Sequence, residues 1–475
     1  MHPPPVTSRR TFLKTSLLGL AGLGIGCTPY RRGGAGAEAA AATDAFLDDV
    51  QRRTFRFFWD TTNPRNGMAR DRYPAPSFAS MAAVGYALTA YPIGVERGFV
   101  ARAAAAERVL ATLRFLASAA QGDAPRGMTG HKGFFYHFVD MESGARFETT
   151  ELSTVDTALL LGGILFCQGY FDRPEESEIR ALADAIYARV DWRWSQARPP
   201  LVALGWSPEQ GHLPYDWVAY SEAMLVYILA LGSPTHALGP ESWAGWAAGL
   251  ARRWGTEYGQ QHVRFGPLFG HQYSHIWIDF RGIRDAFMRE KGIDYFENSR
   301  RATLAQHAYA LANPMGWTGY GPDLWGLTAC DGPADVTVDL GGRSRTFRSY
   351  SARGPGDFDD GTVAPTAAGG SIPFAPEICI PTLMAMRRDH GENLYGGYGF
   401  LDALNPSFTA SVPLRHGKLV PGRGWYDTDY LGIDQGPILA MIENHRTGLV
   451  WNVLRSNPHI RRGLSRAGFT GGWLG

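Results

Sequence analysis

The stretch Ser153-Thr-Val-Asp-Thr-Ala-Leu-Leu-Leu-Gly-Gly-Ile-Leu-Phe166 decides the fold of this chain. Ser153 is a favourable N-cap residue, and Asp156 would lie in the first turn, where a negative charge stabilises a helix start. After that turn the segment is apolar on every face, and a helix that is apolar all round is buried. The pattern therefore predicts an inner helix over residues 154–170.

Residues 95–117 show the complementary pattern, with Arg102, Glu107 and Arg114 spread among alanines as in an outer, solvent-facing helix. Inner and outer helices in alternation predict an all-α ring, an (α/α) toroid whose inner helices begin at one end, where a cleft forms. Residues 336–347 predict a small hairpin inserted in a long loop. Helical periodicity also covers residues 43–59, 78–88, 175–190, 220–231, 242–258, 282–291, 295–312, 376–390, 434–446 and 458–467.

Composition excludes several classes of protein. Hydrophobic residues make up 45% of the 475 residues, so extensive disorder is excluded. Lys and Arg number 46 against 45 Asp and Glu, a net charge of +1, which lacks the basic footprint of a nucleic-acid binder. No GxGxxG, GxxxxGK[ST] or GxSxG motif is present. We therefore expect no cofactor and no nucleic-acid partner.

Metal-binding motifs are also missing from the sequence. The four cysteines form no CxxC pair. His271 and His275 have the spacing of a zincin helix, but Gln272 stands where the general-base Glu would be. Residues 357–361 resemble a calcium loop but lack the later ligands of an EF-hand. The sequence predicts no metal site.

The N-terminus has the residue pattern of an export signal. Arg9-Arg10 precede an apolar stretch from Leu17 to Ile25, which is the pattern of a twin-arginine signal and is too short to span a membrane. Cys27 follows a small residue, as in a bacterial lipoprotein. We expect residues 1–26 to be the signal, 27–42 a flexible tether and 43–475 a single catalytic domain. The predicted location is the periplasm or the outer-membrane or cell surface, with a lipid at Cys27 as the only membrane contact.

Carboxylates in aromatic, Gly-rich segments are the main functional signal. Cleavage of a glycosidic bond needs one protonated and one ionised carboxyl group, and apolar surroundings raise the pKa of the first. Glu222 is the best candidate for the acid, since Trp217 and Tyr220 precede it and apolar residues follow. The alternative for Glu222, and equally for Asp156 and Asp434, is a carboxylate that caps or stabilises a helix start.

Eight strings in order give the chain a family resemblance. They include Gly133-Phe-Phe-Tyr-His-Phe-Val-Asp-Met-Glu142, Phe265-Gly-Pro-Leu-Phe-Gly-His-Gln-Tyr-Ser-His-Ile-Trp-Ile-Asp279 and Gly432-Ile-Asp-Gln-Gly-Pro437. The chain resembles the bacterial glucoamylase-like proteins of glycoside hydrolase family 144 from about Phe55 to Leu474. The resemblance implies a single (α/α)6 barrel and endo-hydrolysis of β-1,2-glucan with inversion. It also implies that Glu222 belongs to the active site.

These observations together predict a monomeric glycoside hydrolase that acts on β-glucan. Transglycosylation on the same fold and a non-catalytic, surface glycan-binding protein are the alternatives. The second carboxylate would come from Asp140, Glu142, Glu151 or Asp156, with Asp434 as a further candidate. Sugar rings would stack on aromatic side chains, and polar side chains would hold sugar hydroxyls. The stacking candidates are Trp217, Trp277, Trp317 and Trp325, and the polar ones Tyr136, His137, His271, Gln272 and His275.

Overall fold

Six buried helices form the centre of the computed structural model, counted within residues 34–475, which are those the structure describes. Residues 44–475 form one compact unit, and the fold is described for this unit. Each of the six helices is buried along most of its length. They are α2 (Met81–Glu96), α4 (Thr154–Tyr170), α6 (Met224–Gly232), α9 (Phe269–Trp277), α12 (Pro365–Gly369) and α14 (Gly432–Arg446).

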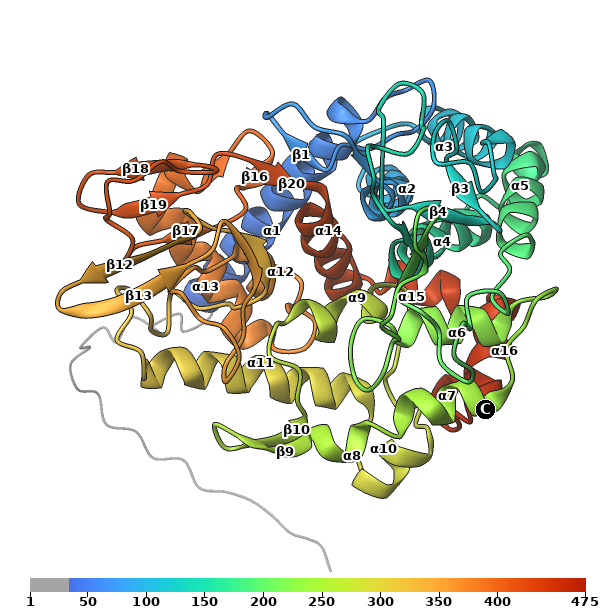
Figure 1. The fold of residues 1–475 in the computed structure, drawn as a ribbon. Helices are drawn as coiled ribbons and strands as arrows, with labels where there is room; N and C mark the ends of the chain where they lie inside the picture. Colours follow the sequence, from blue (N-terminus) through green and yellow to red (C-terminus); the bar gives the residue numbers. More distant parts are fainter. Residues whose placement is uncertain (1–33) are drawn as a thin grey trace, which may run out of the picture. The chain divides into compact units, whose positions relative to one another are not determined.

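These inner helices contact one another in chain order (Figure 1). α2 packs on α4, α4 on α6, α6 on α9, and α12 on α14, which packs back on α2. Gln272 of α9 joins α12 by donating from its Nε2 to the carbonyl oxygen of Ala367, 2.8 Å away. The six helices therefore close on themselves, and their N-terminal ends carry the polar residues described below.

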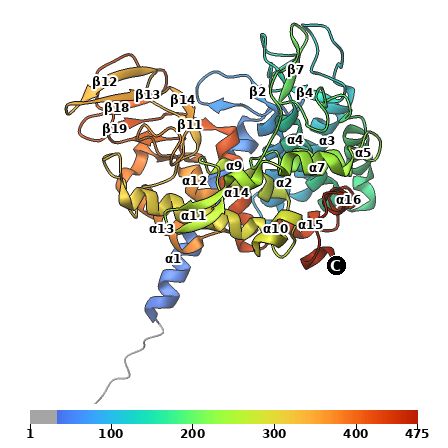
Figure 2. The same ribbon diagram turned by 60° about the horizontal axis from the view of Figure 1, so that its bottom comes forward.

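More exposed helices lie outside this ring (Figure 2). The connection from α2 to α4 contains α3, and that from α4 to α6 contains α5. The mostly helical fold that the sequence predicts is thus confirmed. The outer helices are α1 (Gly34–Thr61), α3 (Arg102–Ser118), α5 (Ser177–Ala188), α7 (Pro240–Ala247), α8 (Leu250–Arg253), α10 (Ala286–Lys291), α11 (Tyr295–Ala312), α13 (Pro376–His390), α15 (Leu449–Leu454) and α16 (Pro458–Arg466).

Several helix boundaries differ from the predicted ones. α1 already begins at Gly34, so residues 34–42 of the expected tether are helical, since alanine is the best helix former. α2 extends to Glu96, and α3 begins only at Arg102. Gly98 between them has a φ of 68°, which ends the first helix. No described helix has the length and apolar character that a membrane span requires.

Short strands are more numerous than the sequence predicts. The hairpin expected at residues 336–347 is confirmed as β12 (Val336–Leu340) with β13 (Arg343–Phe347). Other antiparallel pairs are β1 (Arg72–Tyr73) with β20 (Tyr430–Leu431), β2 (Ala79–Ser80) with β5 (Phe138–Val139), β9 (Trp254–Glu257) with β10 (Gln260–Val263), β11 (Ala329–Asp331) with β14 (Tyr350–Ala352), and β15 (Tyr395–Gly396) with β16 (Gly399–Phe400).

Two larger antiparallel sheets position residues that the site uses. In the first, Phe135 pairs with Ser153, the N-cap residue of α4, so the sheet fixes where that helix begins. In the second sheet, one strand ends at Tyr426, directly before Asp427. Strand order in the first is β3 (Gly130–His131), β4 (Phe134–Tyr136), β6 (Leu152–Ser153), β7 (Gly205–Ser207), β8 (Gly211–His212), and in the second β17 (Leu404–Asn405), β19 (Gly424–Tyr426), β18 (Lys418–Val420).

The contact between α2 and α4 depends on two glycines. A Cβ on Gly163 would lie 2.1 Å from the carbonyl oxygen of Gly85. We expect Gly163→Ala to lower the free energy of unfolding by about 1–3 kcal/mol through overpacking, measured by denaturant unfolding. Gly397→Ala is the matched control, because an added Cβ there meets no atom within 4 Å. An unchanged stability of Gly163→Ala would contradict this packing.

Candidate active site

A cleft of about 640 Å³ opens over the N-terminal ends of α2 and α14. Ser80, the N-cap residue of α2, lies on its wall together with Ile433 of α14. Polar and aromatic side chains from distant parts of the chain complete the wall, among them Asp71, His137, Phe138, Asp331, Tyr350 and His416. The cleft therefore lies at the end of the ring where the sequence places it.

Glu222 immediately precedes the residue at which α6 is capped. Its Oε2 is buried and has no hydrogen-bond partner, and Ala223, the N-cap residue, receives no side-chain cap. Burial, helped by the nearby charge of Asp156, raises the pKa of Glu222 to about 7. The Glu222 backbone carbonyl accepts from Ser274 Oγ at 2.7 Å, which fixes the residue against α9. Glu222 is thus a half-buried acid with one oxygen shielded from solvent, and the helix-cap alternative lacks its hydrogen bond.

Asp156 and Glu151 flank His137. Glu151 Oε1 lies 2.9 Å from His137 Nδ1, and Asp156 Oδ1 lies 3.7 Å from His137 Nε2. Burial lowers the pKa of His137, but the two carboxylates and Asp71 outweigh it and raise the pKa to about 9. The other oxygen of Asp156, Oδ2, accepts from the hydroxyl of Ser153, the N-cap residue of α4. Only Oδ2 of Asp156 is therefore hydrogen-bonded, because the 3.7 Å contact of Oδ1 with His137 is an ion-pair distance.

Four further carboxylates, Asp331, Asp402, Asp427 and Asp434, form what we call the carboxylate cluster. Burial and mutual repulsion raise the pKa values of Asp402 and Asp427 well above the ordinary range, and burial raises that of Asp434. Arg72 contacts only one member, donating from Nη1 to Asp331 Oδ2 at 2.7 Å. Asp402 Oδ1, Asp427 Oδ2 and Asp434 Oδ2 are buried without a partner.

Two buried tyrosines feel the charges of both Glu222 and a member of this cluster, Asp434. Burial raises the pKa of Tyr86 of α2 well above the ordinary range, and the charges of Asp434, Asp156 and Glu222 raise it further. The pKa of Tyr273 of α9 is raised by burial and then by Asp434, Tyr86 and other groups including Glu222. Both phenol groups are therefore neutral. The charges of Glu222, Asp156 and Asp434 all raise the pKa of one tyrosine, Tyr86.

The structure places Asp140 and Glu142 outside this site, which corrects their prediction as second-carboxylate candidates. Asp140 Oδ1 accepts from the backbone amides of Glu142 and Ser143 and from the Ser143 hydroxyl, so it closes an exposed turn. Glu142 is exposed and pairs with Arg65. Both acids are explained by local turn structure and surface charge.

Three of the four tryptophans predicted to stack on sugar are buried core residues. Trp277 stacks on Tyr86 and donates to Thr89 Oγ1, and Trp325 donates to Thr382 Oγ1. Trp317 lies under Arg345 in a small hydrophobic cluster beside the hairpin. Trp217 stays partly exposed and donates to Thr154 Oγ1 at the start of α4. The aromatic residues that line the cleft are instead Phe78, Phe138 and Tyr350.

The polar residues of α9 serve packing, which corrects their prediction as sugar contacts. His271 is buried with its Nε2 3.1 Å from the carbonyl oxygen of Phe265, and His275 Nε2 lies 3.1 Å from Ser299 Oγ. Burial lowers the pKa of His275 to about 3, so this ring is neutral. Gln272 joins α9 to α12, as described above. Tyr136 is buried beneath the guanidinium of Arg146.

Comparison with known proteins identifies the family. Residues 214–458 match the Glycoamylase family model, described as "Putative glucoamylase". A solved structure from Bacteroides uniformis with the same description is 32% identical, with a TM-score of 0.77 over 91% of this chain and 99% of that one. The chain belongs to the glucoamylase-like proteins of glycoside hydrolase family 144.

Other members of family 144 carry more specific names. An endo-β-1,2-glucanase from Chitinophaga pinensis, solved with sophorotriose and glucose, is 29% identical with a TM-score of 0.75 over 91% of this chain and 99% of that one. An exo β-1,2-glucooligosaccharide sophorohydrolase from Parabacteroides distasonis is 30% identical over 89% of this chain. The chain spans 58% of the length of that curated relative.

In this family member, sequence reasoning missed Asp71, Arg72, Asp402, Asp427 and His416. Asp427 stands in Trp425-Tyr-Asp-Thr-Asp-Tyr430, the same acid-in-aromatic pattern that singled out Glu222, so this signal was available. Asp402 carries no local signal. Its neighbour in the cluster, Asp331, is 71 residues away and donates its backbone amide to Asp402 Oδ2 at 2.8 Å.

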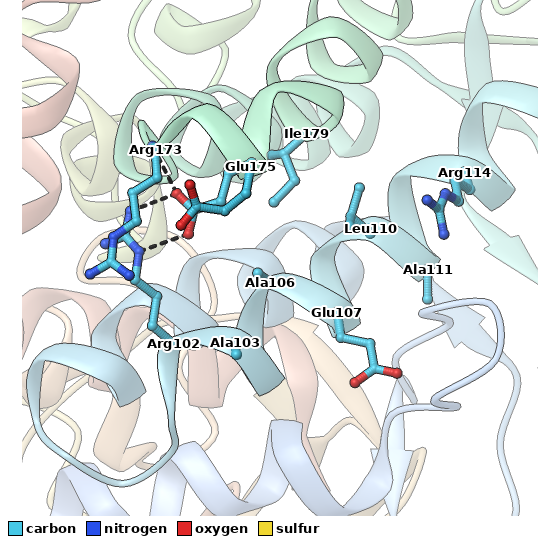
Figure 3. A pocket seen from close by; sticks show the side chains of 11 residues that line it. Arg102, Ala103, Ala106, Glu107, Leu110, Ala111, Arg114, Arg173, Glu175 and Ile179 are labelled. Carbon is cyan, nitrogen blue, oxygen red and sulfur yellow. Dashed lines mark hydrogen bonds and ion pairs between the residues drawn. The ribbon is translucent and has the colours of Figure 1, made fainter.

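A second groove of this family member lies on the outer surface between α3 and α5 (Figure 3). Ala103, Ala106 and Leu110 form one side, and Arg102 closes one end by donating from Nε to Glu176 Oε1 at 2.8 Å. No aromatic side chain lines it, and its acids are paired or exposed. This groove lacks the protonated and ionised carboxyl pair that glycoside hydrolysis needs.

Proposed function

We propose that this protein hydrolyses β-1,2-glucan. Two kinds of observation support the proposal. The endo-β-1,2-glucanase from Chitinophaga pinensis and the sophorohydrolase from Parabacteroides distasonis both act on β-1,2-linked glucose, as their names state. The cleft is also lined by carboxylates, Asp71 and Asp331 among them, and by Ile433, the neighbour of Asp434; glycosidic cleavage uses a pair of carboxyl groups. The family's older glucoamylase label points to α-glucan, which the test below includes.

The observation that carries the proposal is the state of Glu222. Its buried, unpartnered Oε2 and its pKa of about 7 keep the carboxyl group partly protonated at pH 7 and mostly protonated at lower pH. In the proposed reaction Glu222 gives this proton to the glycosidic oxygen as the bond from that oxygen to the anomeric carbon breaks. Asp156 supports this role, because its negative charge helps to keep Glu222 protonated.

We assign the second carboxylate to Asp434. It lies in the first turn of α14, and its charge, like that of Glu222, raises the pKa values of Tyr86 and Tyr273, which supports a place for both carboxyl groups near these tyrosines. Asp156 accepts from Ser153 and has His137 Nε2 3.7 Å from its other oxygen, and we give it the electrostatic role described above. Asp434 would take a proton from the water that attacks the anomeric carbon. The electrons of the broken bond stay on the leaving oxygen, which Glu222 has protonated.

The expected mode is endo-acting with inversion at the anomeric carbon. The endo-acting relative supports the first part, because the two chains match almost end to end. Products from early time points should then be sophoro-oligosaccharides of mixed length, and proton NMR should show α-anomers first. Sophorose as the sole early product would favour the exo-acting mode named for the Parabacteroides relative.

A linkage panel tests the function as a whole. Purified protein is incubated with β-1,2-, β-1,3-, β-1,4- and α-1,4-glucan, and new reducing ends are measured. We expect activity on β-1,2-glucan alone. Chain-lengthened products at high glucan concentration would indicate transglycosylation, and binding without new reducing ends would indicate a glycan-binding protein.

The electrostatic role of Asp156 predicts a pH shift. A general acid works only while protonated, so activity should fall as the pH rises through the pKa of Glu222, about 7. Asp156→Asn removes a charge that raises this pKa, so the alkaline limb of kcat/KM should move to lower pH. Asp48→Asn, on the outer helix α1, is the matched control and should leave the profile unchanged. An unmoved alkaline limb in Asp156→Asn would contradict the coupling.

We further propose that the six inner helices and their outer partners form the (α/α)6 toroid that the resemblance implies, acting as a monomer. Export as a lipoprotein also remains our proposal, because residues 1–26 and Cys27 lie outside the described residues. Cys27→Ser should release the protein from membranes, as measured by cell fractionation, and Arg9→Lys with Arg10→Lys should block export. Membrane attachment that survives Cys27→Ser would contradict the lipid anchor.

A further inference from the structure

We propose that Asp331, Asp402 and Asp427 bind a divalent cation, calcium by their all-carboxylate ligand set, beside the cleft. The sequence gives no hint of this site, because its ligands come from three distant segments. Asp331 ends β11, Asp402 follows β16, and Asp427 follows β19. A metal held by all three would join these segments at one point.

The geometry of the three carboxylates fits a hard cation. Each offers an oxygen, and the three oxygens lie within 4.8 Å of one another. Calcium binds carboxylate oxygens at about 2.3–2.6 Å, so two oxygens on opposite sides of the ion are about 4.8 Å apart. Magnesium is usually bound by only one or two carboxylates and keeps several waters, so a set of three carboxylates favours calcium.

Of these three carboxylates, only Asp331 is paired with a basic side chain within the described residues. Asp331 and Asp427 are fully buried, and Asp402 is 2% exposed. Arg72 pairs with Asp331 and Asp429. Within residues 34–475, no Lys, Arg or His nitrogen lies within 4.0 Å of a carboxylate oxygen of Asp402 or Asp427. Buried carboxylates are normally paired with a cation or bound to a metal.

Hydrogen bonding leaves one oxygen free on each of the other two residues. Asp402 Oδ2 accepts from the Asp331 amide, and Asp427 Oδ1 accepts from the amides of Thr428 and Asp429. Asp402 Oδ1 and Asp427 Oδ2 are buried without any partner. Asp434 adds a third such oxygen, its Oδ2. Buried acceptors without donors are rare in proteins, and a cation would satisfy them together.

Binding of the metal alone tests the proposal without glucan. The full-length protein is freed of metal with a chelator and titrated with CaCl2, MgCl2 or MnCl2 by calorimetry, and its Tm is measured with and without each ion. We expect calcium to bind with a Kd of about 10⁻³ M or tighter and to raise Tm by about 2–5 °C at saturation. Absence of binding and of any Tm shift would overturn the proposal. Preference for magnesium or manganese would overturn the assignment to calcium.

Two conservative variants locate the ion. Asp402→Asn and Asp427→Asn keep the side-chain shape and the oxygen that accepts from backbone amides, and they remove like charge, so the metal-free proteins should fold. Calcium should bind them at least about tenfold more weakly, and its effect on Tm should disappear. Asp48→Asn on α1 should keep both responses. Calcium binding that is unchanged in both cluster variants would overturn this location, whatever the outcome of the glucan assays.

Discussion

Replacing Glu222 by Gln is expected to lower kcat on β-1,2-glucan by about 10²–10⁴-fold, the usual contribution of a general acid. The amide keeps the size of the side chain but has no proton to give. The buried position of Oε2 and the raised pKa of Glu222 are the physical basis for this result. The measurement is the initial rate of reducing-end formation by wild-type and variant protein under the same conditions.

Stability measurements separate this role from a structural one. If Glu222 served only to stabilise the start of α6, its replacement would cost about 0.5–2 kcal/mol of folding free energy and leave kcat near normal. We expect the opposite, with Tm little changed, because α6 has no side-chain cap bond that the replacement could remove. If the variant had wild-type turnover, the general acid would have to be another carboxylate.

Asp434→Asn is expected to lower kcat by a similar factor, about 10²–10⁴-fold. An amide does not accept the proton of the attacking water, so the loss should persist whatever leaving group the substrate carries. The rate on β-1,2-glucan and on an activated aryl glycoside measures this directly. Asp434 has an unpartnered buried oxygen, so removing its charge should not destabilise the fold.

The matched comparison for Asp434→Asn is Asp156→Asn. Asp156 binds Ser153 and lies near His137, and we give it the role of raising the pKa of Glu222. Its replacement should therefore shift the pH profile and leave substantial activity at lower pH. If Asp156→Asn abolished turnover at every pH while Asp434→Asn remained active, the two roles would have to be exchanged.

The helices that the sequence predicts well are long and strongly patterned. α4, α11 and α13 have the predicted bounds, because each contains several turns with consistent burial and clear end signals. Two inner helices, α9 and α12, could not be found in this way. α12 spans five residues, Pro365–Gly369, and α9 carries His271, Gln272 and His275 on a buried surface. Polar side chains satisfied by tertiary hydrogen bonds conceal a core helix from any hydrophobicity pattern.

The sequence predicts a site residue only where the residues next to it in the chain form a recognisable pattern. Glu222 stands among aromatic and apolar residues, and in the structure its Oε2 is buried. Sequence patterns do not separate a tryptophan that binds sugar from one in the core. A large aromatic side chain gains more free energy from full burial than from partial exposure at a binding site, and Trp277 and Trp325 are fully buried. The carboxylate cluster brings together residues such as Asp331 and Asp402, 71 positions apart, which no local spacing indicates.

The proton donated by Glu222 is tested most directly by the dependence on the leaving group. Wild-type protein and Glu222→Gln are compared on β-1,2-glucan and on an aryl β-sophoroside whose nitrophenolate leaves without protonation. The ratio of wild-type to variant rates should fall from about 10²–10⁴ on glucan to a few-fold on the aryl substrate. An equal loss on both substrates would contradict the assignment of Glu222 as the general acid.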